Sequence, residues 1–249
     1  MKTIFNLLTS FFILSSFFFL LPQASLAAAK SVPILMYHYI RDCNCPTDKS
    51  GMILSVSPSN FDEQMGYLAS HGYTPITLDT LAAIYANQAQ APTKPVIITF
   101  DDGYSDFYSN AYPILKKYSF HSVSFIPTGL VGTRGYMSWD NIKELQKFGL
   151  VSFEAHTISH AYLPKLSYQQ MVKELQDSKS TLQNQIGTVV NFVAYPYGAS
   201  NGTVIKAAQS VGYVGGIGTW FGKTTGTTMN MPRVRVNGSF SLSLFASRL

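Results

Sequence analysis

Short apolar segments alternate with amphipathic segments along most of this chain. The apolar segments lack the polar–apolar alternation of a strand with one wet face, which indicates strands buried on both sides. Strands of that kind, each followed by a helix, form parallel sheets with helices packed outside them. The pattern therefore predicts an α/β fold.

The expected elements follow from where each pattern starts and stops. We expect strands at 31–40, 73–78, 95–101, 122–126, 150–155, 189–195, 213–217 and 231–236. We expect helices at 61–71, 81–86, 108–118, 139–148, 167–185 and 201–211. About seven or eight mostly parallel strands fit a closed or nearly closed barrel, with the site at their carboxyl ends. A doubly wound open sheet is the alternative, although no glycine-rich phosphate turn follows the first strand.

The segment 1–27 has the features of a secretory signal peptide. Lys2 gives a basic start, an apolar stretch spans 4–21, and small residues at 25–29 resemble a cleavage site. A retained membrane anchor is the alternative, because the stretch is almost long enough to span a bilayer. We expect a secreted or cell-surface and cell-wall location, with a single mature domain at 28–249.

The formal net charge of +5 is spread along the chain rather than clustered. It offers no basic patch for nucleic acid, although it suits an anionic cell-wall or matrix environment. Cys43 and Cys45 are separated by one residue, so we expect a local disulfide or an intermolecular pairing without a catalytic role. We expect a monomer that touches a membrane only through an uncleaved signal segment.

Two adjacent acids, Asp101 and Asp102, end the apolar run 95–98 and precede Gly103. Charges at the exit of a buried strand are costly unless they are paired or bind metal, which suggests chemistry. Where the chain turns, both carboxylates can border one cavity and take different roles. The alternative is that they only cap the following helix.

Two histidines, His156 and His160, follow another apolar run. A single histidine is more often structural, but two at this spacing can reach one ion where the chain turns back on itself. Together with Asp102 they would form a divalent metal site with an open position, leaving Asp101 as a general base. The mixed nitrogen and oxygen ligands favour zinc, and cobalt, nickel and iron are also compatible.

The segments 99–103 (TFDDG) and 156–160 (HTISH), in this order, resemble the motifs of the polysaccharide deacetylase family. This family is also called carbohydrate esterase family 4 or the nodulation-protein-B-like deacetylases, and the resemblance covers nearly all of the mature chain. It implies an irregular (β/α) barrel, a metal ion held by Asp102, His156 and His160, and catalysis by Asp101 as base. The implied reaction removes N-acetyl groups from amino sugars.

The segment 195–198 (YPYG) is similar to a further family motif, whose tyrosine amide helps to bind the oxyanion. By resemblance this role falls on Tyr197, with Pro196 beside the substrate. The arginine of that motif is absent, because its position is Ala194. We expect Arg233 to replace it as partner of the catalytic aspartate; a surface or strand-edge arginine is the alternative.

Two further positions complete the expected site. The segment 138–140 (SWD) resembles the family's groove motif, which gives Trp139 a substrate contact unless it packs in the core at a helix start. Many members carry a leucine-x-histidine motif near the C terminus, whose histidine protonates the leaving amine, but no histidine follows His160 here. His38 ends the first apolar strand and is our candidate for a site histidine, against a buried structural role.

The start at 36–38 (MYH) together with 195–198 resembles the biofilm-exopolysaccharide branch, which acts on β-1,6-linked N-acetylglucosamine polymers. We therefore expect an exported, metal-dependent N-deacetylase of such a polymer. Peptidoglycan and chitin oligomers are alternative substrates. A metal-free glycoside hydrolase on a similar barrel, with two carboxyl groups about 5–9.5 Å apart, and a non-catalytic sugar-binding protein are the rival functions.

Overall fold

A computed structural model describes residues 31–43, 46–226 and 228–249 of the chain. The predicted signal peptide 1–27 and Cys45 lie outside these residues, whereas Cys43 is disulfide-bonded. Among the helices of the described residues, none is both long and apolar enough to cross a membrane.

The fold is a closed barrel of seven parallel strands with one extra strand at its edge. The order around the barrel is β1-β10-β9-β8-β7-β6-β5, and β1 closes the ring by pairing with β5. The extra strand, β4, pairs with the first residues of β5. These strands are β1 (Ile34–Tyr37), β4 (Thr74–Pro75), β5 (Pro95–Phe100), β6 (Ser122–Ile126), β7 (Val151–Ala155), β8 (Phe192–Ala194), β9 (Gly215–Phe221) and β10 (Met231–Arg235). The predicted α/β barrel is confirmed.

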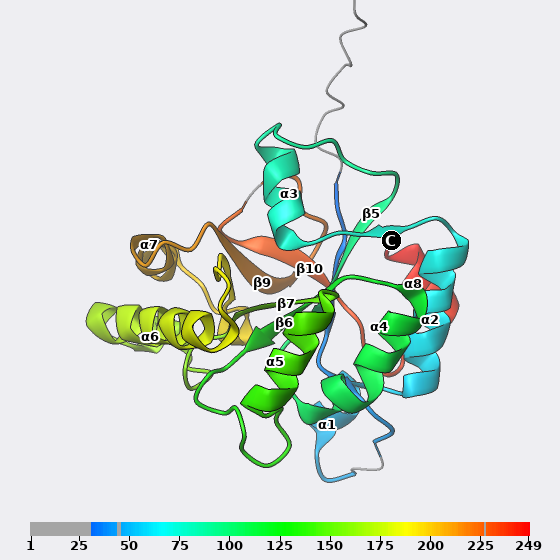
Figure 1. The fold of residues 1–249 in the computed structure, drawn as a ribbon, viewed down its shortest axis with the longest axis horizontal. Coiled ribbons are helices and arrows are strands. Elements are labelled where there is room, and N and C mark those ends of the chain that lie inside the picture. The colour runs from blue at the N-terminus through cyan, green and yellow to red at the C-terminus, as the bar shows by residue number, and fades with distance from the viewer. Residues whose placement is uncertain (1–30, 44–45, 227) are drawn as a thin grey trace, which may run out of the picture.

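Helices surround the barrel, and all but α3 and α1 lie along its outside, as Figure 1 shows. They are α1 (Lys49–Leu54), α2 (Pro58–Ser70), α3 (Leu78–Tyr85), α4 (Tyr112–Tyr118), α5 (Trp139–Phe148), α6 (Tyr168–Ile186), α7 (Gly202–Ser210) and α8 (Leu242–Ser247). A large apolar cluster lies between the strands and these helices. A second cluster fills the barrel interior and includes Ile34, Ile97 and Phe125.

Helix α3 plugs the amino-terminal end of the barrel. Its side chains Leu78 and Leu81 join the interior cluster and pack beside Phe192 and Met231, the first residues of β8 and β10. In Figure 1, α3 lies at the top and α1 at the bottom. Because all barrel strands run the same way, the carboxyl ends of the strands are the end that remains for a site.

Several predicted boundaries were wrong. The expected strand 31–40 is interrupted at His38, and the following β2 (Tyr39–Ile40) pairs with β3 (Ser55–Val56) in a separate small sheet. The expected strand 73–78 shortens to β4 because Thr77 caps α3. The expected helix 108–118 begins as a π-helical turn, η1 (Phe107–Ala111). Helices α1 and α8 were not predicted. Each has six residues, which are too few to show a helical repeat of apolar residues.

Candidate active site

Left-handed backbone conformations mark three loops at the carboxyl ends of the strands. The φ angle is 73° for Asp102 after β5. It is 65° for Thr157 and 56° for His160, which follow β7, and 61° for Tyr197 after β8. Each costs a non-glycine residue about 1–3 kcal/mol, and such strain gathers where function requires it. The three loops therefore form the candidate site.

The turn after β5 brings both acids to this site. Asp102 and Gly103, with φ angles of 73° and 68°, are consecutive left-handed residues, which reverse the chain just after the strand. A Cβ on Gly103 would approach Cδ1 of Ile126 at 3.0 Å, so a glycine fits best here. As a result, the two neighbouring carboxylates both face histidines of the site.

Asp102, His156 and His160 converge on one point. Oδ1 of Asp102 lies 3.3 Å from Nε2 of His156 and 3.3 Å from Nε2 of His160. This oxygen is buried and has no hydrogen-bond partner. Ligand atoms at about 2.0–2.1 Å from a tetrahedral zinc ion lie about 3.3 Å apart, so the observed spacing fits a divalent cation. An ion would also satisfy the otherwise unpartnered oxygen.

The tautomer of His156 also fits the binding of a cation. Its Nδ1 lies 2.7 Å from the carbonyl oxygen of Ala194, and a carbonyl can only accept, so Nδ1–H is the donor. In a neutral ring the lone pair is then on Nε2, which points at Asp102. A hydrogen bond on the far ring nitrogen is the usual way in which proteins orient a metal-binding imidazole.

Arg233 forms a buried, bidentate ion pair with Asp101. Its Nη1 donates to Oδ1 at 2.7 Å and its Nη2 donates to Oδ2 at 2.6 Å. Its Nε donates to the carbonyl oxygen of Gly218 at 2.8 Å, and the side chain is fully buried. The structure therefore excludes a surface arginine. Burial raises the pKa of Asp101, but the charge and hydrogen bonds of Arg233 outweigh this and hold the pKa below its usual value.

His38 lies between β1 and β2, on the same side as Asp101. Its Nε2 is 4.0 Å from Oδ2 of Asp101, and 12% of the side chain is exposed. Burial lowers the pKa of His38, and the charge of Asp101 opposes this only in part. The structure thus brings His38 to the mouth of the barrel, where the sequence had placed it.

Tyr197 and Pro196 occupy a tight turn, η3 (Pro196–Gly198), directly after β8. A Cβ on Gly198 would lie 2.2 Å from Oγ1 of Thr219, so only glycine fits there. Pro196 is buried, whereas the Tyr197 side chain is 63% exposed and its ring meets the His160 ring at 4.6 Å. The turn therefore presents an aromatic ring beside the proposed metal ligands.

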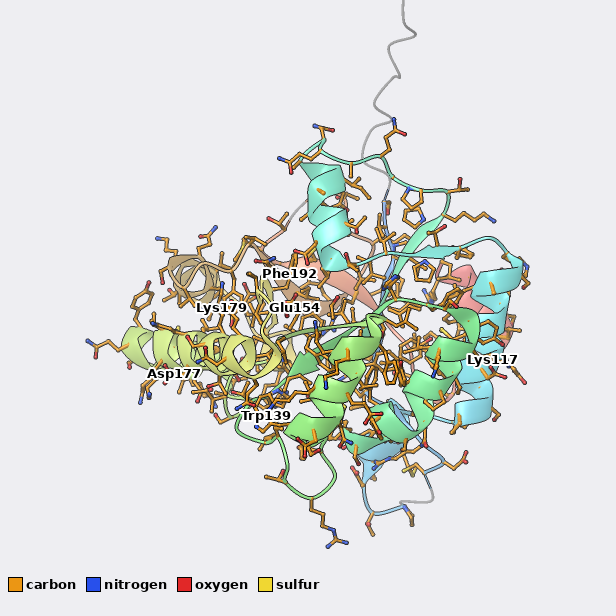
Figure 2. The ribbon with its side chains drawn as sticks, viewed as in Figure 1. Lys117, Trp139, Glu154, Asp177, Lys179 and Phe192 are labelled. Carbon is orange, nitrogen blue, oxygen red and sulfur yellow. The ribbon has the colours of Figure 1, made fainter. Side chains whose placement is uncertain are left out.

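Trp139 is the first residue of α5, and its half-buried ring packs against the large apolar cluster. Figure 2 shows it at the start of this helix. This is the packing of a core residue, so its contact with substrate stays a prediction.

Known proteins resemble the chain in both sequence and fold. The family model for polysaccharide deacetylase matches residues 88–216. A poly-beta-1,6-N-acetyl-D-glucosamine N-deacetylase of Staphylococcus aureus is 33% identical over 199 residues, which is 72% of this chain and 68% of the relative. The chain belongs to the polysaccharide deacetylase family.

Two solved structures support this assignment. The deacetylase PplD of Streptococcus pyogenes, in complex with acetate, has a TM-score of 0.82 and 30% identity, covering 88% of this chain and 98% of that one. BC0361, a polysaccharide deacetylase from Bacillus cereus, has a TM-score of 0.79 and 31% identity, covering 88% of this chain and 69% of that one. Membership indicates a deacetylase that acts on polysaccharide.

An aromatic stack beside Asp102 of this deacetylase was missed by the sequence analysis. The rings of Tyr39 and Tyr104 stack at 3.8 Å, and Tyr136 follows Tyr104 at 5.2 Å. The guanidinium of Arg41 covers Tyr39 at 3.6 Å. These contacts pack the three rings and the guanidinium against one another. The available signal was position, because the first two tyrosines directly follow His38 and Gly103.

Proposed function

We propose that this chain is an exported, metal-dependent enzyme that removes acetyl groups from a polymer of N-acetylglucosamine. One observation supports the proposal most: Asp102, His156 and His160 present ligand atoms within 4.8 Å of one another. Asp101, the carboxylate that directly precedes Asp102, is held beside them by Arg233 instead of joining the cluster. A ligand set with a separate base is one arrangement that can hydrolyse an amide.

Asp101 is the proposed general base. Because Arg233 holds its pKa below the usual value, the carboxylate is ionised at neutral pH and can accept a proton from the attacking water. The two hydrogen bonds from Arg233 also fix the plane of the carboxylate. The base is therefore both charged and oriented before substrate binds.

Asp102, His156 and His160 are the proposed ligands of a divalent ion. Such an ion, when bound, polarises the acetyl carbonyl and lowers the pKa of a nearby water. His156 keeps Nε2 free by donating from Nδ1 to Ala194. Zinc is our first choice, and cobalt, nickel and iron suit the same donors.

His38 and Tyr197 are the proposed partners of the leaving group and the oxyanion. His38 sits near Asp101, so it can receive a proton there and give it to the departing amine. Its lowered pKa makes the protonated ring a readier donor. The backbone amide of Tyr197 would contribute a hydrogen bond to the oxyanion at the turn after β8.

The proposed polymer is β-1,6-linked, because the Staphylococcus aureus relative is named for that activity. The basic and apolar features of segment 1–27 favour export, and a secreted or wall-associated enzyme would meet such a polymer. Each acetyl group removed leaves an amine that is positive at neutral pH, which changes how the polymer binds anionic surfaces.

The test is acetate release by the purified protein from β-1,6-linked and β-1,4-linked N-acetylglucosamine oligomers and from peptidoglycan. Each substrate is assayed with and without a chelator, followed by addition of zinc, cobalt, nickel or iron. We expect the β-1,6 oligomers to be preferred, the chelator to abolish release and a metal to restore it.

Two variants provide a matched control. His160→Ala removes a proposed ligand and should reduce acetate release by at least 100-fold. His71→Ala removes an exposed histidine that stacks on Tyr67 and should leave release unchanged. Release that survives the chelator would contradict the metal site, and new reducing ends without acetate would instead indicate a glycoside hydrolase.

A further inference from the structure

We propose that Glu174 of α6 is a positioning residue for the metal site. Its carboxylate holds the ligand loop, defined as residues 156–160, in the conformation that aims both histidines at Asp102. The inference rests on the proposed metal site and extends it to a residue that no sequence motif marked.

Glu174 makes three hydrogen bonds to the middle of the ligand loop. Its Oε2 accepts the backbone N–H of Ile158 at 2.9 Å and of Ser159 at 3.0 Å. Its Oε1 accepts the hydroxyl of Ser159 at 2.8 Å. One side chain therefore binds Ile158 and Ser159, the two residues between Thr157 and the proposed ligand His160.

The loop needs such support because its backbone is intrinsically unfavourable. Thr157 and His160 both have left-handed φ angles, which place these residues in a region that side chains disfavour. A loop with this conformation relaxes to another one unless its polar groups are bound in place. Its relaxation would rotate His160 away from Asp102, because the second ligand is itself one of the two left-handed residues.

The loop is held from two sides. On one side, the backbone amides of Thr128 and Gly129, which follow β6, donate to the carbonyl oxygens of Thr157 and Ile158, at 3.1 Å and 2.8 Å. On the α6 side, Glu174 accepts from the loop amides. One turn later in the same helix, Ser178 donates to the oxygen of Thr157 at 2.9 Å. The segment after β6 therefore holds the ligand loop from one side and α6 holds it from the other, and Glu174 supplies three of the hydrogen bonds from α6.

Helix α6 can serve as a rigid support. Its buried side chains Met171 and Leu175 join the large apolar cluster, and they flank Glu174 in the sequence. Its outer face carries the exposed pair Lys173–Asp177, and Asp177 is labelled in Figure 2. The position of Glu174 is therefore fixed by core packing that does not involve the metal ligands.

The test compares Glu174→Ala, Glu174→Gln and the control Asp177→Ala in the otherwise intact chain. The readouts are the zinc dissociation constant, measured by competition with a chromogenic chelator, and the visible spectrum of the cobalt-loaded protein. Circular dichroism and thermal unfolding of the metal-free proteins check that each variant folds. Wild-type protein is measured in parallel.

We expect Glu174→Ala to weaken zinc binding about 10–100-fold, the range typical when a group outside the ligand set that orients the ligands is lost. Glu174→Gln keeps an oxygen for the two amides and an amide group for the Ser159 hydroxyl, so it should bind within about threefold of wild type. Asp177→Ala removes the same charge from the same helix and should match wild type in both readouts. The cobalt spectrum should change only for Glu174→Ala.

Other outcomes separate the two proposals. If wild-type protein does not bind zinc, the proposed metal site fails, and the positioning role fails with it. If wild type binds zinc and a folded Glu174→Ala binds it equally well, only the positioning role is overturned. If Glu174→Gln is as weak as Glu174→Ala, the negative charge rather than the hydrogen bonding to the loop matters, which also overturns the proposal as stated.

Discussion

Asp101 and Glu154 are buried to the same extent, with 3% of each exposed, yet their pKa values shift in opposite directions. Asp101 lies at the mouth of the barrel and has the guanidinium of Arg233 against both of its oxygens. That cation outweighs burial and lowers the pKa of Asp101.

Glu154 lies on β7, in the barrel wall, and has neutral partners. Its Oε2 accepts the backbone N–H groups of Asn191 and Phe192, at 2.9 Å and 2.8 Å. Burial raises the pKa of Glu154 to about 8, the nearby charge of Asp79 adds to this, and Lys179 opposes it. Glu154, Phe192 and Lys179 are labelled in Figure 2.

The difference shows that the partner, rather than burial, decides the charge of an interior carboxylate in this protein. A buried acid without a cation keeps its proton, and Glu154 uses its carboxyl group to accept backbone N–H groups. A buried acid with a cation at ion-pair distance stays charged and can act as a base. The experiments below test this contrast.

The largest expected effect is on turnover in Asp101→Asn. This change removes the proposed base while keeping its shape, so acetate release should fall by about 10²–10⁴-fold. Zinc affinity should change little, because Asp102 and the histidines are the proposed ligands. The comparison is Glu154→Gln, which should retain wild-type release; an equal loss in both variants would remove the distinction between the two carboxylates.

The next effect is on stability in Arg233→Met. Removing one member of a buried ion pair leaves Asp101 uncompensated, so the free energy of unfolding should fall by about 3–5 kcal/mol. Urea denaturation at pH 7 measures it. As a control, Lys117→Met breaks the exposed pair with Asp62, which lies on the surface and should give no measurable change. A stability equal to wild type for Arg233→Met would show that the pair does not determine the charge of Asp101.

The third effect, which is the smallest when taken per pH unit, is the pH dependence that Glu154 contributes to stability. Its pKa is about 8 in the fold against 4.5 for the free side chain, so the folded state binds the extra proton between these values. This stabilisation is fully present below about pH 4.5 and is lost as the pH rises through about 8, by at most about 1.4 kcal/mol per pH unit. Glu154→Gln should remove the Glu154 contribution, so the slope in urea titrations of the chelator-treated protein should differ from that of wild type, in which Asp106 and the site histidines also titrate.

Asp101 gives the opposite sign and serves as the internal comparison. Its pKa is lowered on folding, so its contribution is present above its unfolded value of 3.8 and is lost as the pH falls below that value. Glu154→Gln should leave this acid limb unchanged. A slope between pH 4.5 and 8 that is the same in Glu154→Gln as in wild type would contradict the raised pKa of Glu154.

Much of the site was predictable because its residues stand at the ends of strands. In parallel sheets, strand ends meet at one edge, so Asp101, Asp102, His156 and His160 were expected together although 53 residues of chain separate the second acid from the first histidine. The missing motif arginine also left a recognisable candidate, Arg233, within the last strand. Apolar runs and helix periods predicted the barrel for the same reason: they record which faces are buried.

Other features had no local signal. Glu174 lies on a helix among charged neighbours. Nothing in the adjacent sequence distinguishes it from Asp177, which faces solvent. Equally, Glu154 sits in a strand where an acid is unexpected, but only the nearby amides of β8 explain how it is tolerated. Short elements such as α1 and α8 depend on packing against distant segments, which local propensity does not contain.

By itself, the sequence determined the periodicities, the strand ends and the kinds of side chain placed there, because these depend on neighbours along the chain. The tertiary structure alone decided which carboxylate is charged, which nitrogen of His156 is free and which residue supports the ligand loop. Those properties depend on the closure of the barrel by β1 and β5 and on groups brought from far apart in the chain. Electrostatic and hydrogen-bond energies act over a few ångströms in space, regardless of distance in the sequence.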